Sequence, residues 1–166
     1  MSLARSMNDI LIREATPADT AEVTTVFETA FAPLRSIYRP TDAALACQAE
    51  RAQTRTRLVA EFDGKIVATV EYDLHAEHVH VIGLAVHPDF QHKGIARRLL
   101  DWICMRAKEL GLPAVVLDTI RETGNVPLFE KLGFRVVHEE PATWCVSETY
   151  RKVHDVKLER IVVLKR

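Results

Sequence analysis

The sequence has few cysteines, no long apolar run and almost no net charge. Its three cysteines are odd in number and share no close spacing, which argues against a disulfide scaffold and favours a reducing compartment. No stretch approaches the roughly 18 consecutive apolar residues of a membrane helix. With 22 basic and 23 acidic side chains, the formal net charge of −1 gives no overall field that would attract nucleic acid. We therefore expect a soluble cytoplasmic protein that binds neither membranes nor nucleic acid.

The length and composition suit a single domain. The chain has 166 residues and 48% hydrophobic content, enough for one well-buried core. Residues 1–9 lack the apolar segment of a secretory signal and are expected to form a loose leader. No segment recurs at a fixed period or has low complexity. We predict one domain over residues 1–166.

Short β-rich runs dominate the first half of the chain. Thr16, followed by proline, is expected to begin a helix that reaches about Phe31, and Thr41 or Asp42 a second, alanine-rich helix. Asp63-Gly64 predicts a hairpin. A short turn near Glu77 separates residues 65–74 from residues 78–86, so antiparallel pairing of these two runs is the simplest arrangement. The expected strands are residues 10–14, 56–62, 65–74 and 78–86.

The second half alternates helical and strand patterns. From Gly94 the apolar residues recur at helical spacing until Gly111. A short helix is expected near residues 125–132, and residues 141–155 permit no assignment. The expected strands are residues 113–119, 134–140 and 156–164. This order predicts a mixed α/β fold, a mostly antiparallel sheet with a central parallel β-α-β crossover.

In the stretch "VHPDFQHKGIARRLL", residues 86–100, the end of an expected strand is followed by a turn and then by the start of a helix. A helix N-terminus has unpaired amides and about half a positive charge, which suits a phosphate. Gly94 lets the backbone approach a bulky anion, while Lys93, Arg97 and Arg98 add positive charge. Lysine before glycine excludes a nucleotide-binding P-loop, and the single glycine excludes a dinucleotide fingerprint. The alternative is an ordinary helix start with solvated cations.

Residues 91–96, "QHKGIA", resemble the pyrophosphate loop of the GNAT superfamily of acyl-CoA-dependent N-acyltransferases, whose pattern is Q/R-x-x-G-x-G/A after a strand end. "LAVHPDFQHKGIARRLL" resembles the strand-loop-helix core of that family, and "NVPLFEKLGFRVV" resembles its later helix-strand segment. The order of elements from residue 10 to about residue 138 matches as well. The resemblance covers most of the chain.

The resemblance implies a binding mode for acetyl-CoA without a metal. The parallel strands around Leu84 and Val116 would splay apart and admit the pantetheine arm, which would pair with backbone groups of Leu84 and Val86. Amides of residues 92–97 would hold the pyrophosphate. The implied cofactor-binding residues are Leu84, Ala85, Val86, Gln91, His92, Lys93, Gly94, Ile95, Ala96, Arg97, Asn125 and Phe129.

The resemblance also implies catalytic roles for His80 and Leu84. His80 stands four residues before Leu84, where many family members carry a glutamate base, and a neutral imidazole can accept a proton from the amine. A surface histidine on a hairpin is the alternative. The N–H of Leu84 would face the thioester oxygen and stabilise developing charge. The implied reaction is direct attack of an amine on the thioester.

One position departs from the family pattern. Family members usually read Y-E-K-L-G-F, in which the tyrosine protonates the leaving thiolate, whereas this chain has Phe129. Tyr150, Ser147 or water could substitute, and a thiolate is a tolerable leaving group because a thiol has a pKa of about 8.5. Asn125 keeps the family's asparagine, for which a helix cap is the alternative role.

The hairpin expected from residues 65–74 and 78–86 carries a cluster of histidines and an interior glycine. His75, His78 and His80 form H-x-x-H-x-H, but no cysteine or carboxylate offers convincing ligand geometry, so we expect polar hairpin residues rather than a metal site. Gly83, inside a β-branched strand, predicts a bulge or a close backbone approach.

Acceptor residues in this family come mainly from the loop between the first two helices and from the late strands, here residues 31–40 and 141–155. Trp144 lies in the second segment, either as a packing residue or as a wall of the substrate site. Cationic side chains there favour an acceptor with a carboxylate or another anion, although solvated loop charges are the alternative. The polar and aromatic residues concerned are Arg35, Tyr38, Arg39, Tyr150, Arg151 and Lys152.

The predicted function is transfer of an acetyl or other short acyl group from acyl-CoA to a primary amine of a small molecule or peptide. The alternatives are a CoA-binding module or sensor with little catalysis, which Phe129 suggests, and an interaction domain that keeps only the fold. The apolar final strand "ERIVVL", residues 159–164, could pair with a second subunit in a homodimer.

Overall fold

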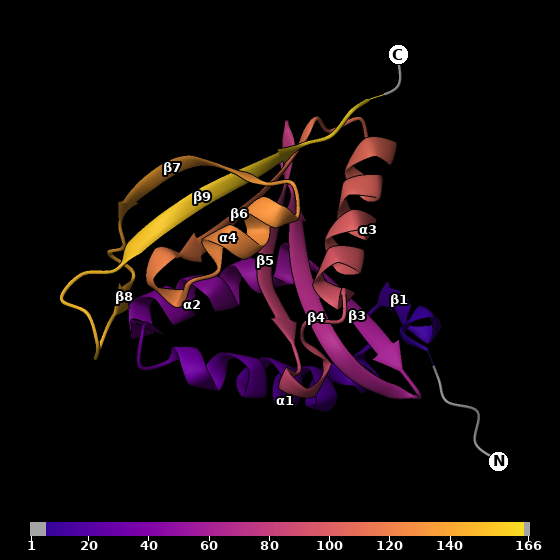
Figure 1. Ribbon diagram of the computed structural model, residues 1–166, viewed down its shortest axis with the longest axis horizontal. Helices are drawn as coiled ribbons and strands as arrows, with labels where there is room; N and C mark the ends of the chain where they lie inside the picture. Colours follow the sequence, from indigo (N-terminus) through magenta and orange to yellow (C-terminus); the bar gives the residue numbers. More distant parts are fainter. Residues whose placement is uncertain (1–5, 165–166) are drawn as a thin grey trace.

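The computed structural model describes residues 6–164. Within them, a seven-stranded sheet has the order β1-β3-β4-β5-β6-β9-β7 (Figure 1). Neighbouring strands are antiparallel except for β5 and β6, so the predicted mixed sheet with a parallel crossover is confirmed. The strands are β1 (Leu11–Glu14), β3 (Thr56–Phe62), β4 (Lys65–Leu74), β5 (His78–Val86), β6 (Ala114–Ile120), β7 (Arg135–Pro141) and β9 (His154–Ile161).

Helices cover both faces of this sheet. The main core lies between the sheet and α3 (Ile95–Glu109), where Leu99 and Ile103 are fully buried beside Val79, and α4 (Val126–Lys131) joins the same core. On the other face, Val23 and Val26 of α1 (Thr20–Phe31) pack on β3 and β4. α2 (Asp42–Arg51) buries none of its residues. No helix in residues 6–164 has the length and apolar character of a membrane span.

Short-range signals locate the element boundaries as predicted. Thr16 forms a capping box with Asp19 at the 3-10 turn that leads into α1. Thr41 begins α2, and its hydroxyl accepts a hydrogen bond from the Ala44 amide at 3.2 Å. Asp63 has φ 53° and the following glycine has φ 77°, the left-handed conformations that a tight hairpin requires. Each of these signals acts within about one turn of chain.

The C-terminal half of the sheet differs from the prediction. β9 lies between β6 and β7, so Leu158 has both Leu117 and Val136 as cross-strand partners. Pairing with β7 ends at Glu159, so within residues 159–164 only this first residue is paired on both sides, and pairing of the rest with a second subunit stays a prediction. The unassigned residues 141–155 contain β8 (Cys145–Val146), which pairs with β2 (Arg39–Pro40). Of the expected loose leader, residues 7–9 form a 3-10 turn, and residues 1–5 lie outside the described residues.

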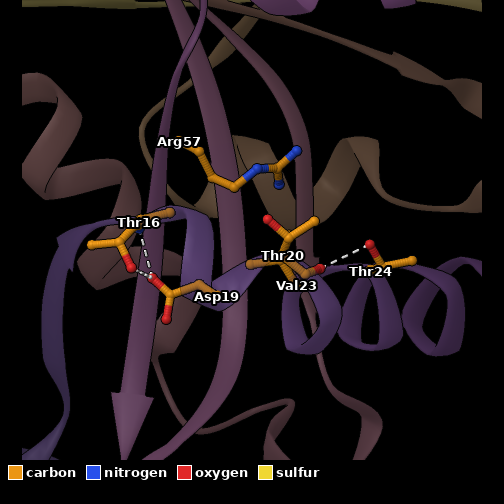
Figure 2. A pocket seen from close by; sticks show the side chains of 7 residues that line it. Thr16, Asp19, Thr20, Val23, Thr24 and Arg57 are labelled. Atoms are coloured by element: carbon orange, nitrogen blue, oxygen red, sulfur yellow. Dashed lines mark hydrogen bonds between the residues drawn. The ribbon is translucent and has the colours of Figure 1, made fainter.

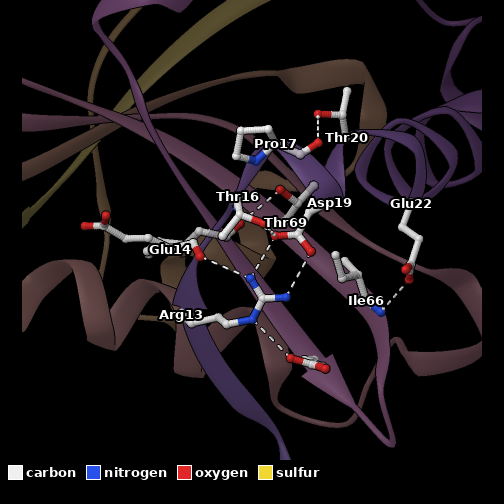
Figure 3. Close-up of polar contacts among 11 residues, drawn as sticks. Arg13, Glu14, Thr16, Pro17, Asp19, Thr20, Glu22, Ile66 and Thr69 are labelled. Carbon is white, nitrogen blue, oxygen red and sulfur yellow. Dashed lines mark hydrogen bonds and ion pairs between the residues drawn. The ribbon is translucent and has the colours of Figure 1, made fainter.

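Asp19→Asn should destabilise the protein at neutral pH. Arg13 donates to both carboxylate oxygens of Asp19, at 2.8 and 2.9 Å, and the Thr16 amide donates at 2.7 Å (Figure 3). The hydrogen bond from Arg13, followed by that from Thr16, holds the pKa of Asp19 far below its usual range. A lowered folded-state pKa contributes stability above the unfolded-state value of about 3.9, and this contribution is lost as the pH falls further.

Urea denaturation of the wild type and Asp19→Asn at several pH values measures this contribution. The difference in the free energy of unfolding should be full at pH 7 and should shrink below about pH 4. A difference that stays constant across that range would show that the charge of Asp19 is not the cause.

Candidate active site

β5 and β6 separate along their length, which exposes one edge of β5. Their parallel register runs from His78 opposite Ala114 to Val81 opposite Leu117 and then stops. In Figure 1 the ends of the two strands point in different directions. The predicted splay at Leu84 is therefore present, whereas Val116 still pairs with His80, so on β6 the divergence begins only after Leu117. An unpaired strand edge can bind an extended chain of amides through main-chain hydrogen bonds.

A bulge in β5 shapes this edge. The register with β4 jumps from Glu71 opposite Ile82 to Thr69 opposite Ala85, so two residues of β5 share one position. Gly83 has φ +61°, and a Cβ atom there would lie 3.3 Å from Cε2 of Phe27. The predicted bulge and the predicted close approach are both confirmed. α1 therefore restricts position 83 to glycine and holds the adjacent Leu84 backbone in place.

The loop before α3 has the features of an anion cradle. Gly94 is the N-cap residue with φ +83°, and within the described residues no side chain caps the helix. A Cβ atom at Gly94 would meet no heavy atom within 4 Å, so the space beside this residue is open. His92 also has a positive φ, 62°, an uncommon conformation for a side-chain-bearing residue. Lys93 and Arg97 are exposed beside the loop. These residues fit the pyrophosphate of acetyl-CoA.

Other predicted cofactor residues serve through their backbone or support the loop. The side chains of Ala85 and Ile95 are buried at 2% exposure, so only their main chain is available to a ligand. The side-chain amide of Gln91 donates to the Val86 carbonyl at 3.0 Å, and a pantetheine amide would share this acceptor. Ala96 is half-buried at the first turn of α3.

Asn125 and Phe129 lie on α4 in different environments. Asn125 is the N-cap residue, but in the described structure its side chain makes no capping hydrogen bond, which removes the alternative role considered above. Phe129 is 8% exposed and packs edge-on against Phe134, with ring centroids 6.2 Å apart. Its ring belongs to the main core.

His80 has an acidic partner on the neighbouring strand. Its Nε2 lies 2.8 Å from Oδ2 of Asp118, and each side chain is about one-third exposed, at 31% and 33%. A carboxylate in this position orients the imidazole. Sequence analysis missed Asp118 because only the register of β6 brings it beside His80. The pair lies beside the point where β5 and β6 diverge.

The neighbouring histidines do not complete a metal site. The rings of His75 and His78 stack at 4.6 Å, and the rings of His75 and His80 lie 6.0 Å apart. Burial, followed by the nearby charge of His75, lowers the pKa of His78. In residues 6–164 no group of three histidine, cysteine or acidic side chains is arranged to hold a metal ion.

The two segments predicted to recognise the acceptor lie side by side. β2 pairs with β8, the Thr41 amide donates to the Trp144 carbonyl at 2.9 Å, and the Thr149 hydroxyl donates to the Ser36 carbonyl at 2.9 Å. Arg35 and Tyr38 are half-buried at this junction. The other predicted side chains are exposed, namely Arg39, Tyr150, Arg151 and Lys152. The Ser147 hydroxyl accepts from the Tyr150 amide at 2.9 Å and so belongs to a local turn.

A separate pocket lies between the start of α1 and β3 (Figure 2). Asp19 in its wall is paired with Arg13, and Arg57 donates to Thr69 at 3.0 Å and is ion-paired with Glu71. β3 is also separated from β5 by β4. The charges of this pocket are already matched within the protein.

Comparisons with known proteins identify the family and the fold of this chain. The model of the acetyltransferase (GNAT) family matches residues 21–134. An acetyltransferase of Pectobacterium atrosepticum is 36% identical over 102 residues, 59% of this chain and 66% of the length of that protein. The ribosomal-protein-S18-alanine N-acetyltransferase of Escherichia coli has a TM-score of 0.72 at 17% identity, over 95% of this chain and 96% of the other. For yncA of Salmonella typhimurium, solved with its cofactor acetyl-CoA, the TM-score is 0.69 at 23% identity, over 95% and 96%. The two structures show the same fold.

Proposed function

Because this chain belongs to the GNAT acetyltransferase family, as its motifs predicted, we propose that it transfers an acetyl group from acetyl-CoA to a primary amine of a small molecule or peptide in the cytoplasm. The observation that carries the proposal is the His80–Asp118 pair, 2.8 Å apart, beside the unpaired end of β5. An uncapped helix start with open space at Gly94 follows that strand. A base and an anion cradle thus stand at opposite ends of one strand-loop segment.

The acetyl donor would be held mainly by backbone groups. The edge of β5 at Leu84 and Val86 would pair with the pantetheine arm, and the first amides of α3 would face the pyrophosphate. Lys93 and Arg97 add positive charge, and Asn125 offers an uncommitted amide beside α4. When bound, acetyl-CoA supplies the thioester that is cleaved.

The protein's own contribution to the reaction is proton transfer and charge stabilisation. His80 accepts a proton from the acceptor's ammonium group, and Asp118 orients its imidazole. The neutral amine then forms a bond to the acetyl carbon as the carbon–sulfur bond breaks. The Leu84 N–H donates to the carbonyl oxygen as negative charge develops on it. A second proton is lost from nitrogen, and CoA leaves as the thiol, with water as its proton source in the absence of a tyrosine at position 129.

A panel of primary amines with acetyl-CoA tests this function. Release of free thiol that depends on both substrates, with a matching acetylated amine found by mass spectrometry, is the expected result. Binding of acetyl-CoA without thiol release from any amine would favour the alternative of a CoA-binding module, for which Phe129 is the supporting observation. If acetyl-CoA does not bind either, the remaining alternative is an interaction domain that keeps only the fold.

Phe129→Tyr should raise the chemistry-limited rate modestly without changing the affinity for acetyl-CoA. A phenol at this position can donate a proton as charge develops on sulfur, and this helps only in the transition state. Single-turnover rates with a poor and a good amine are the measurement. The buried surroundings of Phe129 offer the opposite outcome: an unchanged rate together with a loss of about 1–3 kcal/mol of stability would mean that the new hydroxyl is unsatisfied in the core.

We also propose a homodimer, as in the sequence-based expectation, but through a surface other than β9. Inside the sheet, β9 is paired on both sides up to Glu159, whereas β1 and β7 are the edge strands. All residues of β7 are exposed, which makes it the edge available for pairing with a second copy. Light scattering at micromolar concentration should give the mass of two chains, and the mass of one chain would exclude this assembly.

A further inference from the structure

Two charged side chains near the active site each hold a buried atom without a partner. Nη1 of Arg35 and Oδ1 of Asp155 are buried and make no hydrogen bond in the described structure. A third such atom, Nε of Arg55, lies 3.5 Å from a carboxylate oxygen of Asp73. Leaving a buried charged group unsatisfied is costly, and native structures rarely do so without a functional reason. The two atoms near the active site have opposite charges.

An aromatic bridge joins these two side chains. The guanidinium carbon of Arg35 lies 5.6 Å from the ring centroid of Tyr38 and 5.4 Å from that of Phe31. Tyr38 packs edge-on against Trp144 with centroids 5.7 Å apart, and Nε1 of Trp144 donates to Oδ2 of Asp155 at 2.9 Å. The rings and the indole N–H thus restrain both charged groups, while one buried atom of each makes no hydrogen bond.

This cluster borders the active site. Asp155 on β9 is the cross-strand partner of Ile120 on β6, and Asp118 is two residues earlier on the same face of β6. Asp155 is therefore a diagonal neighbour of the carboxylate that holds His80. Burial, with a smaller contribution from the charge of Asp118, raises the pKa of Asp155. Lys157, the cross-strand partner of Asp118, already places one positive charge beside these carboxylates, and Oδ1 of Asp155 still lacks a hydrogen-bond partner.

We propose that Arg35 and Asp155 recognise the acceptor, and that the acceptor is a small zwitterion, an α-amino acid or a close analogue with an apolar side chain. Its carboxylate binds the free Nη1 of Arg35, and its ammonium group donates to the free Oδ1 of Asp155 before it passes its proton to His80. Tyr38 and Trp144 provide the aromatic wall for the side chain. This inference rests on the proposed acetyl transfer and names its substrate class.

Binding to the complex with CoA tests the recognition without requiring turnover. L-Leucine, L-phenylalanine and L-methionine serve as probes. Each is compared with its carboxamide and with the primary amine that lacks the carboxyl group. Calorimetry should show that at least one amino acid binds about 10-fold or more tightly than its amide and its amine. Equal affinities within every series, or no binding by any of the three amino acids, would overturn the proposal.

Arg35→Gln, with Arg51→Gln as its control, tests the anion contact. Arg51 is an exposed arginine at the end of α2, outside the segments predicted to recognise the acceptor. Arg35→Gln should weaken binding of the preferred amino acid by about 10-fold or more and leave its amide within about 2-fold, while Arg51→Gln changes neither. Arg35→Lys, which keeps the charge, should recover part of the loss. An equal loss for the amino acid and its amide would indicate a structural role and contradict the proposal.

Asp155→Asn, with Glu140→Gln as its control, tests the ammonium contact. Glu140 is the exposed cross-strand neighbour of Asp155 on β7. Asp155→Asn should weaken the preferred amino acid by about 10-fold, and Glu140→Gln should not. Measuring thiol release distinguishes failure of the proposed substrate class from failure of the proposed acetyl transfer. If amines and amino acids are acetylated equally well, the zwitterionic substrate is wrong but acetyl transfer stands. If an amino acid binds selectively but is not acetylated, acetyl transfer is wrong but recognition of the zwitterion stands.

Discussion

Replacing Gly94 with aspartate should abolish acetyl-CoA binding. Gly94 stands at the start of α3 with φ +83°, and a Cβ atom there would enter open space. The aspartate side chain would occupy the space that the pyrophosphate requires, and its negative charge would oppose the phosphates. Calorimetry with acetyl-CoA should therefore give no detectable heat at concentrations that saturate the wild type.

Gly111→Asp is the matched control for the backbone effect. Gly111 has φ +72° beyond the other end of α3, and its Cβ would also meet nothing within 4 Å. Both variants thus carry the strain of a non-glycine residue in the left-handed region, which costs roughly 1–2 kcal/mol. Only Gly94→Asp should lose the ligand. Near-normal affinity in a folded Gly94→Asp protein would mean that the cradle lies elsewhere.

His80→Ala should reduce kcat/KM by about 10²-fold or more, because the ammonium group of the acceptor then has no positioned base. In the wild type the rate should fall on the acidic side of neutrality, the range in which histidine side chains gain a proton. The variant should lose this limb of the pH profile. At high pH the acceptor amine is already neutral and needs no base, so the kcat/KM values of the wild type and His80→Ala should converge there. The measurement is the pH dependence of thiol release under kcat/KM conditions.

Two further variants distinguish a base from a structural histidine. His78→Ala removes the neighbouring imidazole on the same face of β5 and should leave the acidic limb in place. Asp118→Asn keeps the size of the partner at 2.8 Å but removes the carboxylate that orients the imidazole, so it should lower the rate, though less than His80→Ala does. A His80→Ala enzyme with an unchanged pH profile would refute the assignment of the base.

The sequence by itself determined the features that depend on neighbouring residues. Thr16 and Thr41 begin helices because their capping acts over three positions, and Asp63-Gly64 turns a hairpin because its conformations are local. Gly83 indicated a bulge and Gly94 a bare helix start for the same reason. The family motif predicted the anion cradle and the position of the base, since both predictions concern one continuous strand-loop-helix segment.

Only the tertiary structure decided which distant residues meet. Asp118 is 38 residues from His80 in sequence and becomes its partner through the parallel register of β5 and β6. The insertion of β9 between β6 and β7 could not be predicted either, because several strand orders satisfy the same pattern of apolar residues. That insertion carries Asp155 to the end of β6, where Trp144 and Tyr38 connect it to Arg35. The physical reason is that period and propensity are local quantities, whereas register and strand order follow from packing of the whole core.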